Sequence, residues 1–319
     1  MRRQTGYRLP ARGLLPALLL ALLPLGMAQA QAPCPEYWML ATRGCPQVLG
    51  TDPAPFLRAY RLESGRLACR DPAELIAASP GRPVILLIHG SYFTARMAAA
   101  EGLGIRRDLA AFGVIPPDAL VVEFDWPSQL TTPNLIRDAN EKARRAYVAG
   151  YHLARFLRRF PEGTRVSLVG HSHGALAALS ALHLLGGGVL ENGHEATVLA
   201  SCGPRLRLRA VAIAPACDRH WLAPGERLGQ SLAACEGVLC LYNPLDPALI
   251  THPFGRYSEH RRALGKAGMS ADGLPGPLIT RYQEMNIAPL LGPRHTFRGT
   301  TARPVIARSM APYLWASEG

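Results

Sequence analysis

Lysine is almost missing from this sequence of 319 residues, although its formal net charge is +12. Lys142 and Lys266 are its only lysines, so arginine carries nearly all of the positive charge. The arginines are scattered, and no basic run is interleaved with aromatic residues as in nucleic-acid-binding proteins. We therefore expect a basic surface and no nucleic-acid partner, and attraction to anionic membranes stays open as an additional property.

Cysteine pairs with the spacing of a zinc site are also missing, and no metal or other cofactor is expected. The chain has seven cysteines. In an exported protein cysteines are more often paired than free, so the sequence predicts disulfides. The plausible short-range pairs are Cys34 with Cys45, Cys202 with Cys217, and Cys235 with Cys240, which leave Cys69 over.

Beyond the first 30 residues, the sequence lacks any apolar run long enough to span a bilayer. Residues 1–30 combine an arginine-rich start, an uncharged apolar run at 14–26 and small residues ending at Ala30. This pattern predicts a secretory signal peptide that is cleaved near Ala30, and hence export to the periplasm or the medium. A membrane anchor is the alternative, but the apolar run is shorter than the roughly 20 residues that a spanning helix needs.

Two regions follow the signal segment. Residues 31–80 are rich in Pro, Gly and Arg and predict an irregular extension with one strand near 37–42. Residues 81–319 alternate apolar runs with helical patterns, which predicts one α/β domain with a mostly parallel central sheet and helices on both faces, a three-layer αβα arrangement. The expected strands are 83–90, 119–126, 165–170, 208–216 and 237–243, with a weaker candidate at 282–287, and the expected helices are 95–112, 138–160, 174–185, 260–267 and 304–315.

The run Gly170-His171-Ser172-His173-Gly174 lies between a predicted strand and a predicted helix. A G-x-S-x-G run in that setting is typical of a nucleophile on a sharp turn, where small residues two positions away leave space for it. The positive end of the following helix favours an oxyanion beside the serine. We expect Ser172 to be the nucleophile and the two histidines not to serve as its base.

An oxyanion needs two backbone donors. The amide of His173 is the first, and the loop after His89-Gly90 supplies the second at the carboxyl end of a buried strand. Ser91 is the expected donor, or Tyr92 if the loop is one residue tighter.

An acid and a base are expected downstream, in the order serine, carboxylate, histidine. Asp246 follows a strand on a proline-flanked turn and is the preferred acid, with Asp218 as its rival. His295, in the loop before the closing helix, is the preferred base. His252 lies only six residues after Asp246, and His260 lies on a charged helical face, so both are less suited.

These motifs resemble the α/β-hydrolase superfamily, and in particular a little-characterised bacterial branch of it. The shared features, in order, are His89-Gly90, the run Phe124-Asp125-Trp126-Pro127-Ser128, and the serine turn at 170–174. The resemblance covers residues 83 to about 319. It implies that Trp126 borders the site and that Asp125 is structural.

The sequence thus predicts an exported serine hydrolase that cleaves a carboxylic ester or related acyl bond of a small-molecule or lipid-like substrate through Ser172, His295 and Asp246. A non-catalytic binding module on the same fold is the alternative, because a misplaced base would leave the serine inert.

Overall fold

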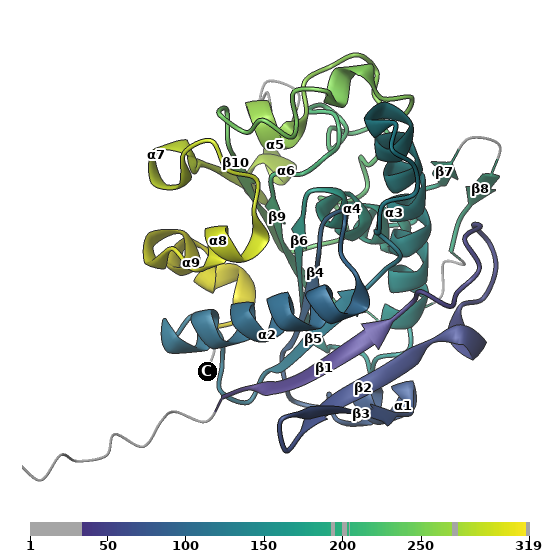
Figure 1. The fold of residues 1–319 in the computed structure, drawn as a ribbon, viewed down its shortest axis with the longest axis vertical. Helices are drawn as coiled ribbons and strands as arrows, with labels where there is room; N and C mark the ends of the chain where they lie inside the picture. Colours follow the sequence, from purple (N-terminus) through teal and green to yellow (C-terminus); the bar gives the residue numbers. More distant parts are fainter. Residues whose placement is uncertain (1–33, 193–194, 200–202, 204, 270–273, 317–319) are drawn as a thin grey trace, which may run out of the picture. The chain divides into compact units, whose positions relative to one another are not determined.

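The computed structural model describes residues 34–192, 195–199, 203, 205–269 and 274–316. The expected signal peptide and Cys202 lie outside these residues. One nine-stranded sheet runs through the described part in the order β11-β10-β9-β6-β4-β5-β1-β2-β3 (Figure 1). Its strands are β1 (Glu36–Ala41), β2 (Arg58–Glu63), β3 (Arg66–Arg70), β4 (Val84–Ile88), β5 (Leu120–Asp125), β6 (Arg165–His171), β9 (Arg207–Ile213), β10 (Gly237–Tyr242) and β11 (Tyr282–Asn286).

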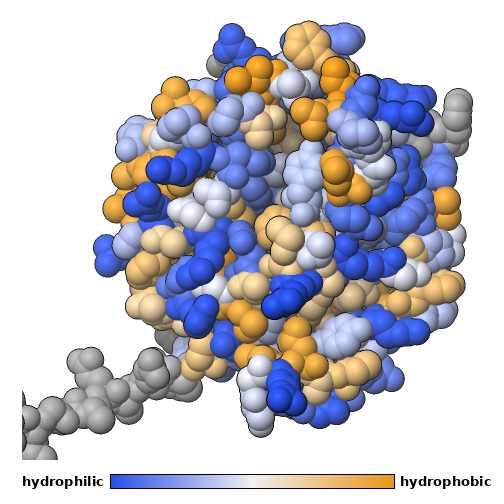
Figure 2. All heavy atoms as spheres, viewed as in Figure 1, coloured by the Kyte–Doolittle hydropathy of each residue, from blue (hydrophilic) through white to orange (hydrophobic). Residues whose placement is uncertain are grey.

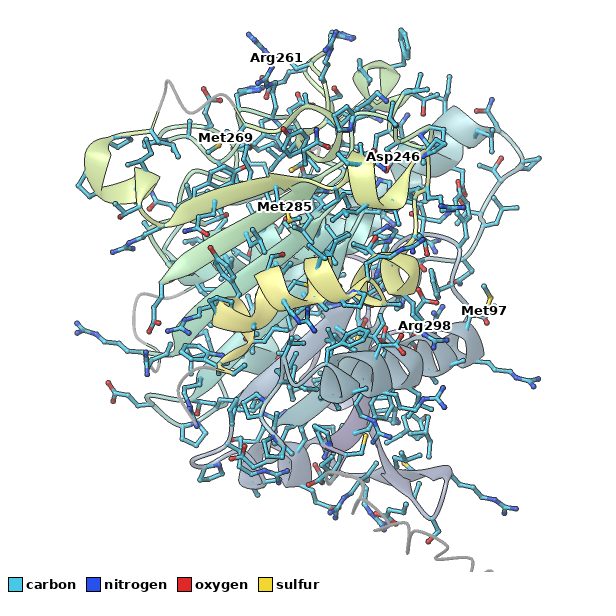
Figure 3. The ribbon with its side chains drawn as sticks, turned by 90° about the vertical axis from the view of Figure 1, so that its left-hand side faces the viewer. Met97, Asp246, Arg261, Met269, Met285 and Arg298 are labelled. Atoms are coloured by element: carbon cyan, nitrogen blue, oxygen red, sulfur yellow. The ribbon has the colours of Figure 1, made fainter. Side chains whose placement is uncertain are left out.

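Helices cover both faces of this sheet. The pair α3 and α4 packs on one face, while α2 and the C-terminal helices α8 and α9 lie on the other (Figures 1 and 3). The helices are α1 (Pro72–Ala77), α2 (Ala95–Ala111), α3 (Leu135–Leu157), α4 (His173–Leu185), α5 (Leu264–Ala267), α6 (Gly276–Ile279), α7 (Ala288–Leu291), α8 (Phe297–Thr301) and α9 (Pro304–Met310), with short 3-10 turns η1 (Ala54–Phe56), η2 (His252–Phe254) and η4 (Ala311–Leu314).

This arrangement is the three-layer αβα architecture of the α/β-hydrolase fold, as the sequence predicts. Strands β1, β4, β5, β6, β9, β10 and β11 are mutually parallel. Successive side chains of β4 enter opposite cores, with Leu86 on the α4 face and Leu87 on the α2 face. A strand buried on both faces must be apolar throughout, which is why residues 84–88 could be recognised in the sequence.

The segment 31–80 differs from the irregular extension that we expected. β1 pairs in parallel with β5 and antiparallel with β2, and β3 extends the sheet further. The side chain of Arg43, just beyond β1, holds the buried Asp125 at 2.7 Å. β2 and β3 could not be recognised from their sequences because they lie near the sheet edge, where only one face needs apolar residues and arginine is tolerated.

No strand or helix is expected between the helix at 174–185 and the strand at 208–216, but the described residues there form regular structure. It includes a small hairpin of β7 (Leu190–Asn192) and β8 (Glu195–Thr197). The expected helix at 260–267 is limited to α5, because Asp218 and Ala263 form an isolated bridge that extends the preceding chain.

The structure does not form the expected disulfides Cys34–Cys45 and Cys235–Cys240, and all six described cysteines are free thiols. Cys235 Sγ lies against the carbonyl of Ser231, whereas Cys240 lies within β10 beside Tyr282. Cys217, the expected partner of Cys202, is a buried free thiol. Short sequence spacing does not bring two side chains together when one of them is fixed in a strand.

No helix among the described residues combines the length and the apolar character needed to cross a membrane. The face seen in Figure 2 mixes polar and apolar side chains.

Glu123 on β5 is a buried acidic residue whose environment disfavours its charged form. Its carboxylate is fully buried between the sheet and α2, and neither of its oxygens has a hydrogen-bond partner. Burial and the nearby Asp125 raise the pKa of Glu123 well above its ordinary value. The folded protein therefore holds this proton up to a higher pH than the unfolded chain does.

We expect the substitution Glu123→Gln to stabilise the protein increasingly as the pH rises above 4.5. In the wild type, this group lowers the free energy of unfolding by about 1.4 kcal/mol per pH unit between its unfolded and folded pKa values, and the glutamine variant lacks that slope. Urea unfolding at pH 5 and pH 8 measures the difference. The exposed Glu162→Gln is the control, and equal curves for Glu123→Gln and the wild type at both pH values would contradict the expectation.

Candidate active site

Ser172 lies at the turn from β6 into α4, near the centre of the sheet. Its backbone has φ 56° and ψ −121°, a conformation that is strained for any residue with a side chain. The surrounding backbone holds it there: its amide donates to the carbonyl of Ile213 at 2.9 Å, and its carbonyl accepts from the amides of Ala175 and Ala216. Such strain at a serine before a helix is the geometry of a nucleophile elbow.

Two glycines allow the elbow to form. A side chain at Gly174 would overlap the carbonyl oxygens of Ile88 and His89, at the end of β4. A side chain at Gly90 would lie 2.8 Å from the ring of His171 and 3.3 Å from the Cβ of Ser172. Neither position has space for a side chain, so the end of β4 and the serine turn after β6 can approach each other closely.

The two predicted oxyanion donors face the same turn. Neither the amide of Ser91 nor that of His173 donates a hydrogen bond to another described residue. The amide of Tyr92, in contrast, donates to the carbonyl of Ser128 at 2.7 Å. The structure therefore favours Ser91 over Tyr92 as the second donor.

The ring of His173 has a role that the sequence did not reveal. Its Nδ1 lies 2.9 Å from the hydroxyl of Ser91 and so joins the two donor residues. Burial, and then the proximity of His252, lower the pKa of His173 to about 3. The ring is neutral at pH 7, and its contact with Ser91 is a neutral hydrogen bond.

His89 forms the platform under this loop. Its ring is buried, stacks on Trp126 at 5.7 Å between centroids, and lies 3.3 Å from Asp125. The indole of Trp126 donates to the carbonyl of His89 at 2.8 Å. Asp125 thus has the structural position that the resemblance implies. Trp126 is fully buried beside His89, and it does not line the small cavity next to His173, so it does not border the site as the resemblance implies.

Asp246 and His295 come together although 49 positions separate them. The Nδ1 of His295 lies 2.6 Å from a carboxylate oxygen of Asp246, which is fully buried. The other carboxylate oxygen accepts from the amide of Ala248 at 2.8 Å. With Nδ1 held by a carboxylate, Nε2 is the nitrogen of His295 that is left for a reacting group.

Asn243 fixes the two loops to each other. Its side-chain amide donates to the carbonyls of Gly292 and Arg294, at 2.8 and 3.2 Å, so the loop of Asp246 and the loop of His295 share one clamp. The sequence signal was available, since an asparagine at the end of a strand beside the predicted acid is a candidate for such a bond.

His295 lies against the serine turn. Its ring is 4.5 Å from the ring of His171, which in turn stacks on Phe297 at 5.6 Å. Among the described residues, no hydrogen bond joins Ser172 to His295. Such a bond commonly forms only when substrate is bound. His171 itself is buried, and burial lowers its pKa well below the ordinary value, so it packs as a neutral ring.

The two rival residues of the sequence prediction pair with each other. The Nε2 of His252 lies 2.6 Å from a carboxylate oxygen of the buried Asp218. Asp218 also accepts from the hydroxyl of Ser258 at 3.0 Å and from the amide of Glu259 at 2.7 Å. Hydrogen bonds such as that from His252 lower the pKa of Asp218 against the opposing effect of burial. The third rival, His260, is exposed and bonds to the carbonyl of Pro253.

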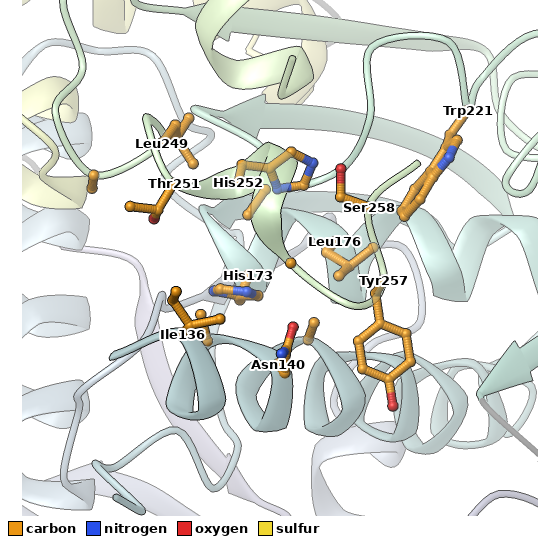
Figure 4. Close-up of a pocket in the computed structure, with 15 residues that line it drawn as sticks. Ile136, Asn140, His173, Leu176, Trp221, Leu249, Thr251, His252, Tyr257 and Ser258 are labelled. Carbon is orange, nitrogen blue, oxygen red and sulfur yellow. The ribbon is translucent and has the colours of Figure 1, made fainter. Parts of the chain in front are cut away.

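A small cavity of about 70 Å³ opens beside the serine turn, between α3 and the loop around η2 (Figure 4). His173 and Leu176 of α4 line it from one side, and Leu249, His252 and Trp221 line it from the other. Most of the lining is apolar. The cavity has space for a short acyl group.

Asp218, His220 and Glu259 bring potential metal-ligand atoms within 4.8 Å of one another. Glu259 already bonds His220 at 2.9 Å and the indole of Trp221 at 3.1 Å, while Asp218 holds His252. These contacts form a hydrogen-bonded cluster that holds Trp221 and His252 in place in the lining of the cavity.

Comparisons with known proteins find distant likenesses. No protein-family model and no curated protein matches the chain. Among solved structures, TT1662 from Thermus thermophilus is 15% identical over 81% of this chain and 92% of its own, with a TM-score of 0.37. A bifunctional GH43-CE protein from Bacteroides eggerthii is 13% identical over 75% of this chain and 34% of its own, with a TM-score of 0.37. A phosphonate-inhibited esterase B from Lactobacillus rhamnosis is 11% identical over 91% of this chain and 89% of its own, with a TM-score of 0.36.

Proposed function

We propose that this protein is a serine hydrolase that cleaves a carboxylic ester or a related acyl bond. The observation that carries the proposal is the strained backbone of Ser172 at the start of α4, with the bonded pair of Asp246 and His295 in the adjoining loops. A serine in that conformation costs stability, and strain of this kind is retained at sites where function requires it.

The mechanism follows from the arrangement. Ser172 Oγ attacks the acyl carbonyl while Nε2 of His295 takes its proton. Asp246 accepts the Nδ1–H bond and stabilises the imidazolium that forms. The amides of His173 and Ser91 stabilise the oxyanion, assisted by the positive end of α4. His295 then protonates the leaving group, which departs from the acyl-enzyme. In the second half of the reaction His295 takes a proton from water, which attacks the acyl carbonyl. His295 returns that proton to Ser172 Oγ as the acid product leaves.

Substitution of Ser172 tests the function directly. We expect a fluorophosphonate to label the wild type once, at Ser172, and we expect Ser172→Ala to lose both the label and about 10⁴-fold or more of kcat on p-nitrophenyl acetate. Ser309→Ala on α9 is the control. A folded wild type that neither takes the label nor cleaves the ester would leave a binding module as the function.

The identity of the base can be tested separately, because two histidines are each bonded to a buried carboxylate. We expect His295→Gln and Asp246→Asn to lower kcat by about 10³- to 10⁴-fold, since they remove proton transfer or the correct tautomer. His252→Gln and Asp218→Asn should have effects at least 100-fold smaller on kcat. If His252→Gln has the larger effect on a neutral ester, the pair of Asp218 and His252 is the catalytic one.

We further propose that the enzyme acts after export. The arginine-rich start, the apolar run at 14–26 and the small residues up to Ala30 support this placement. N-terminal sequencing of the protein from the periplasm or medium of an expressing bacterium should begin at Gln31. Full-length protein that stays in the cytoplasm would contradict the proposal.

A further inference from the structure

A second histidine–carboxylate pair lies at the cavity beside the serine turn, which His173 and His252 both line. His252 belongs to η2, and its Nε2 is held by the buried Asp218, whereas its Nδ1 makes no hydrogen bond to another described residue. Asp218 is itself fixed by Ser258 and by the amide of Glu259. The ring of His252 is therefore held in one orientation, because the buried carboxylate that bonds it is itself fixed by two further donors.

The rest of the cavity offers little to a charged group. The other histidine of the lining, His173, is neutral at pH 7 because burial lowers its pKa to about 3. Leu176, Ala216 and Leu249 supply apolar surface. Figure 4 shows His252 across the cavity from His173 and close to Ser258. The Nδ1 of His252 is therefore a ring nitrogen of the lining that is available to a polar group of a ligand.

A basic groove continues from this cavity. The groove has a volume of about 600 Å³ and shares Asn140 and Tyr257 with the cavity. Four arginines and a single carboxylate line it, and that carboxylate, Glu141, is already paired with Arg144 and Arg145. Within the described residues, the exposed side chains of Arg137 and Arg256 make no hydrogen bond or ion pair. The groove therefore has positive charge that the described residues do not neutralise.

We propose that the site selects esters that carry an anionic group, a carboxylate or a phosphate, a few atoms from the scissile bond. The apolar cavity takes the carbon chain next to the reacting carbonyl. Arg137 and Arg256 attract the anion along the groove. In its doubly protonated form, His252 donates an Nδ1–H hydrogen bond to the same anion while Nε2 stays bonded to Asp218. This inference rests on the proposed hydrolase function and adds a substrate class to it.

Paired substrates that differ in the anionic group test the selection. On the acyl side, the p-nitrophenyl monoester of glutaric acid is compared with p-nitrophenyl 5-methylhexanoate, which replaces the carboxylate by an isopropyl group. On the alcohol side, 1-butyrylglycerol 3-phosphate is compared with 1-butyrylglycerol. We expect kcat/KM to be about 10- to 100-fold higher for the anionic member of one pair, as one or two charge-assisted hydrogen bonds imply. The favoured pair identifies the side that carries the anion.

Substitutions locate the selection in the proposed residues. His252→Gln and the double variant Arg137→Gln/Arg256→Gln should each reduce the anionic-to-neutral ratio of kcat/KM by about 10-fold. His260→Asn and Arg308→Gln, which alter exposed side chains outside the cavity and groove, are the matched controls. An additional readout is the ratio at 0.5 M salt, which should fall because the groove is exposed.

Fluorophosphonate labelling of the same preparations separates the two proposals. Wild type that labels at Ser172 but prefers the neutral ester in both pairs overturns the anion selection alone. Wild type that fails to label overturns the hydrolase function and the selection with it. An anionic preference that survives in both the His252 and the double arginine variants also overturns the assignment.

Discussion

The contact between the ends of β4 and β6 is the constraint on which the candidate site depends. At this point Gly174 meets the last carbonyls of β4, and Gly90 meets the ring and backbone around Ser172. No side chain fits between them, so the strained serine and the loop of Ser91 are held at a fixed separation. Because the sheet is parallel, the loops after β9, β10 and β11 reach the same edge, where they can supply an acid, a base and a cavity wall.

Much of the fold could be predicted because the buried strands have simple requirements. Residues 84–88 are apolar on both faces and residues 166–171 are buried on both faces, and the helices between these strands show regular apolar spacing. The strands at 58–63 and 66–70 could not be recognised, since they lie near a sheet edge and tolerate arginine and glutamate. The disulfide prediction was wrong because export predicts pairing in general, whereas each pair needs two side chains that point at one another.

The elements of the site differed in how far they could be predicted. Ser172 stands in a local motif, and its environment follows from a strand, a turn and a helix that are adjacent in sequence. Asp246 and His295 depend on contacts between distant loops, and chain order was the signal for them. The pairing of Asp218 with His252 could not be foreseen, because η2 returns to a strand that ends more than 30 residues earlier. The bond from His173 to Ser91 likewise needs the β4–β6 contact before it can be inferred.

The reaction rates of the free cysteines can be used to measure local opening of the folded chain. Cys34 and Cys69 are exposed, whereas burial raises the pKa of the Cys235 and Cys240 thiols to about 12 and raises that of Cys217 as well. A thiol-specific reagent reacts with the thiolate, so in the native state it distinguishes the two surface cysteines from these three. Each of the three lies in the core cluster on the α4 face of the sheet. The rate at which they react therefore measures how often that half of the core exchanges with solvent.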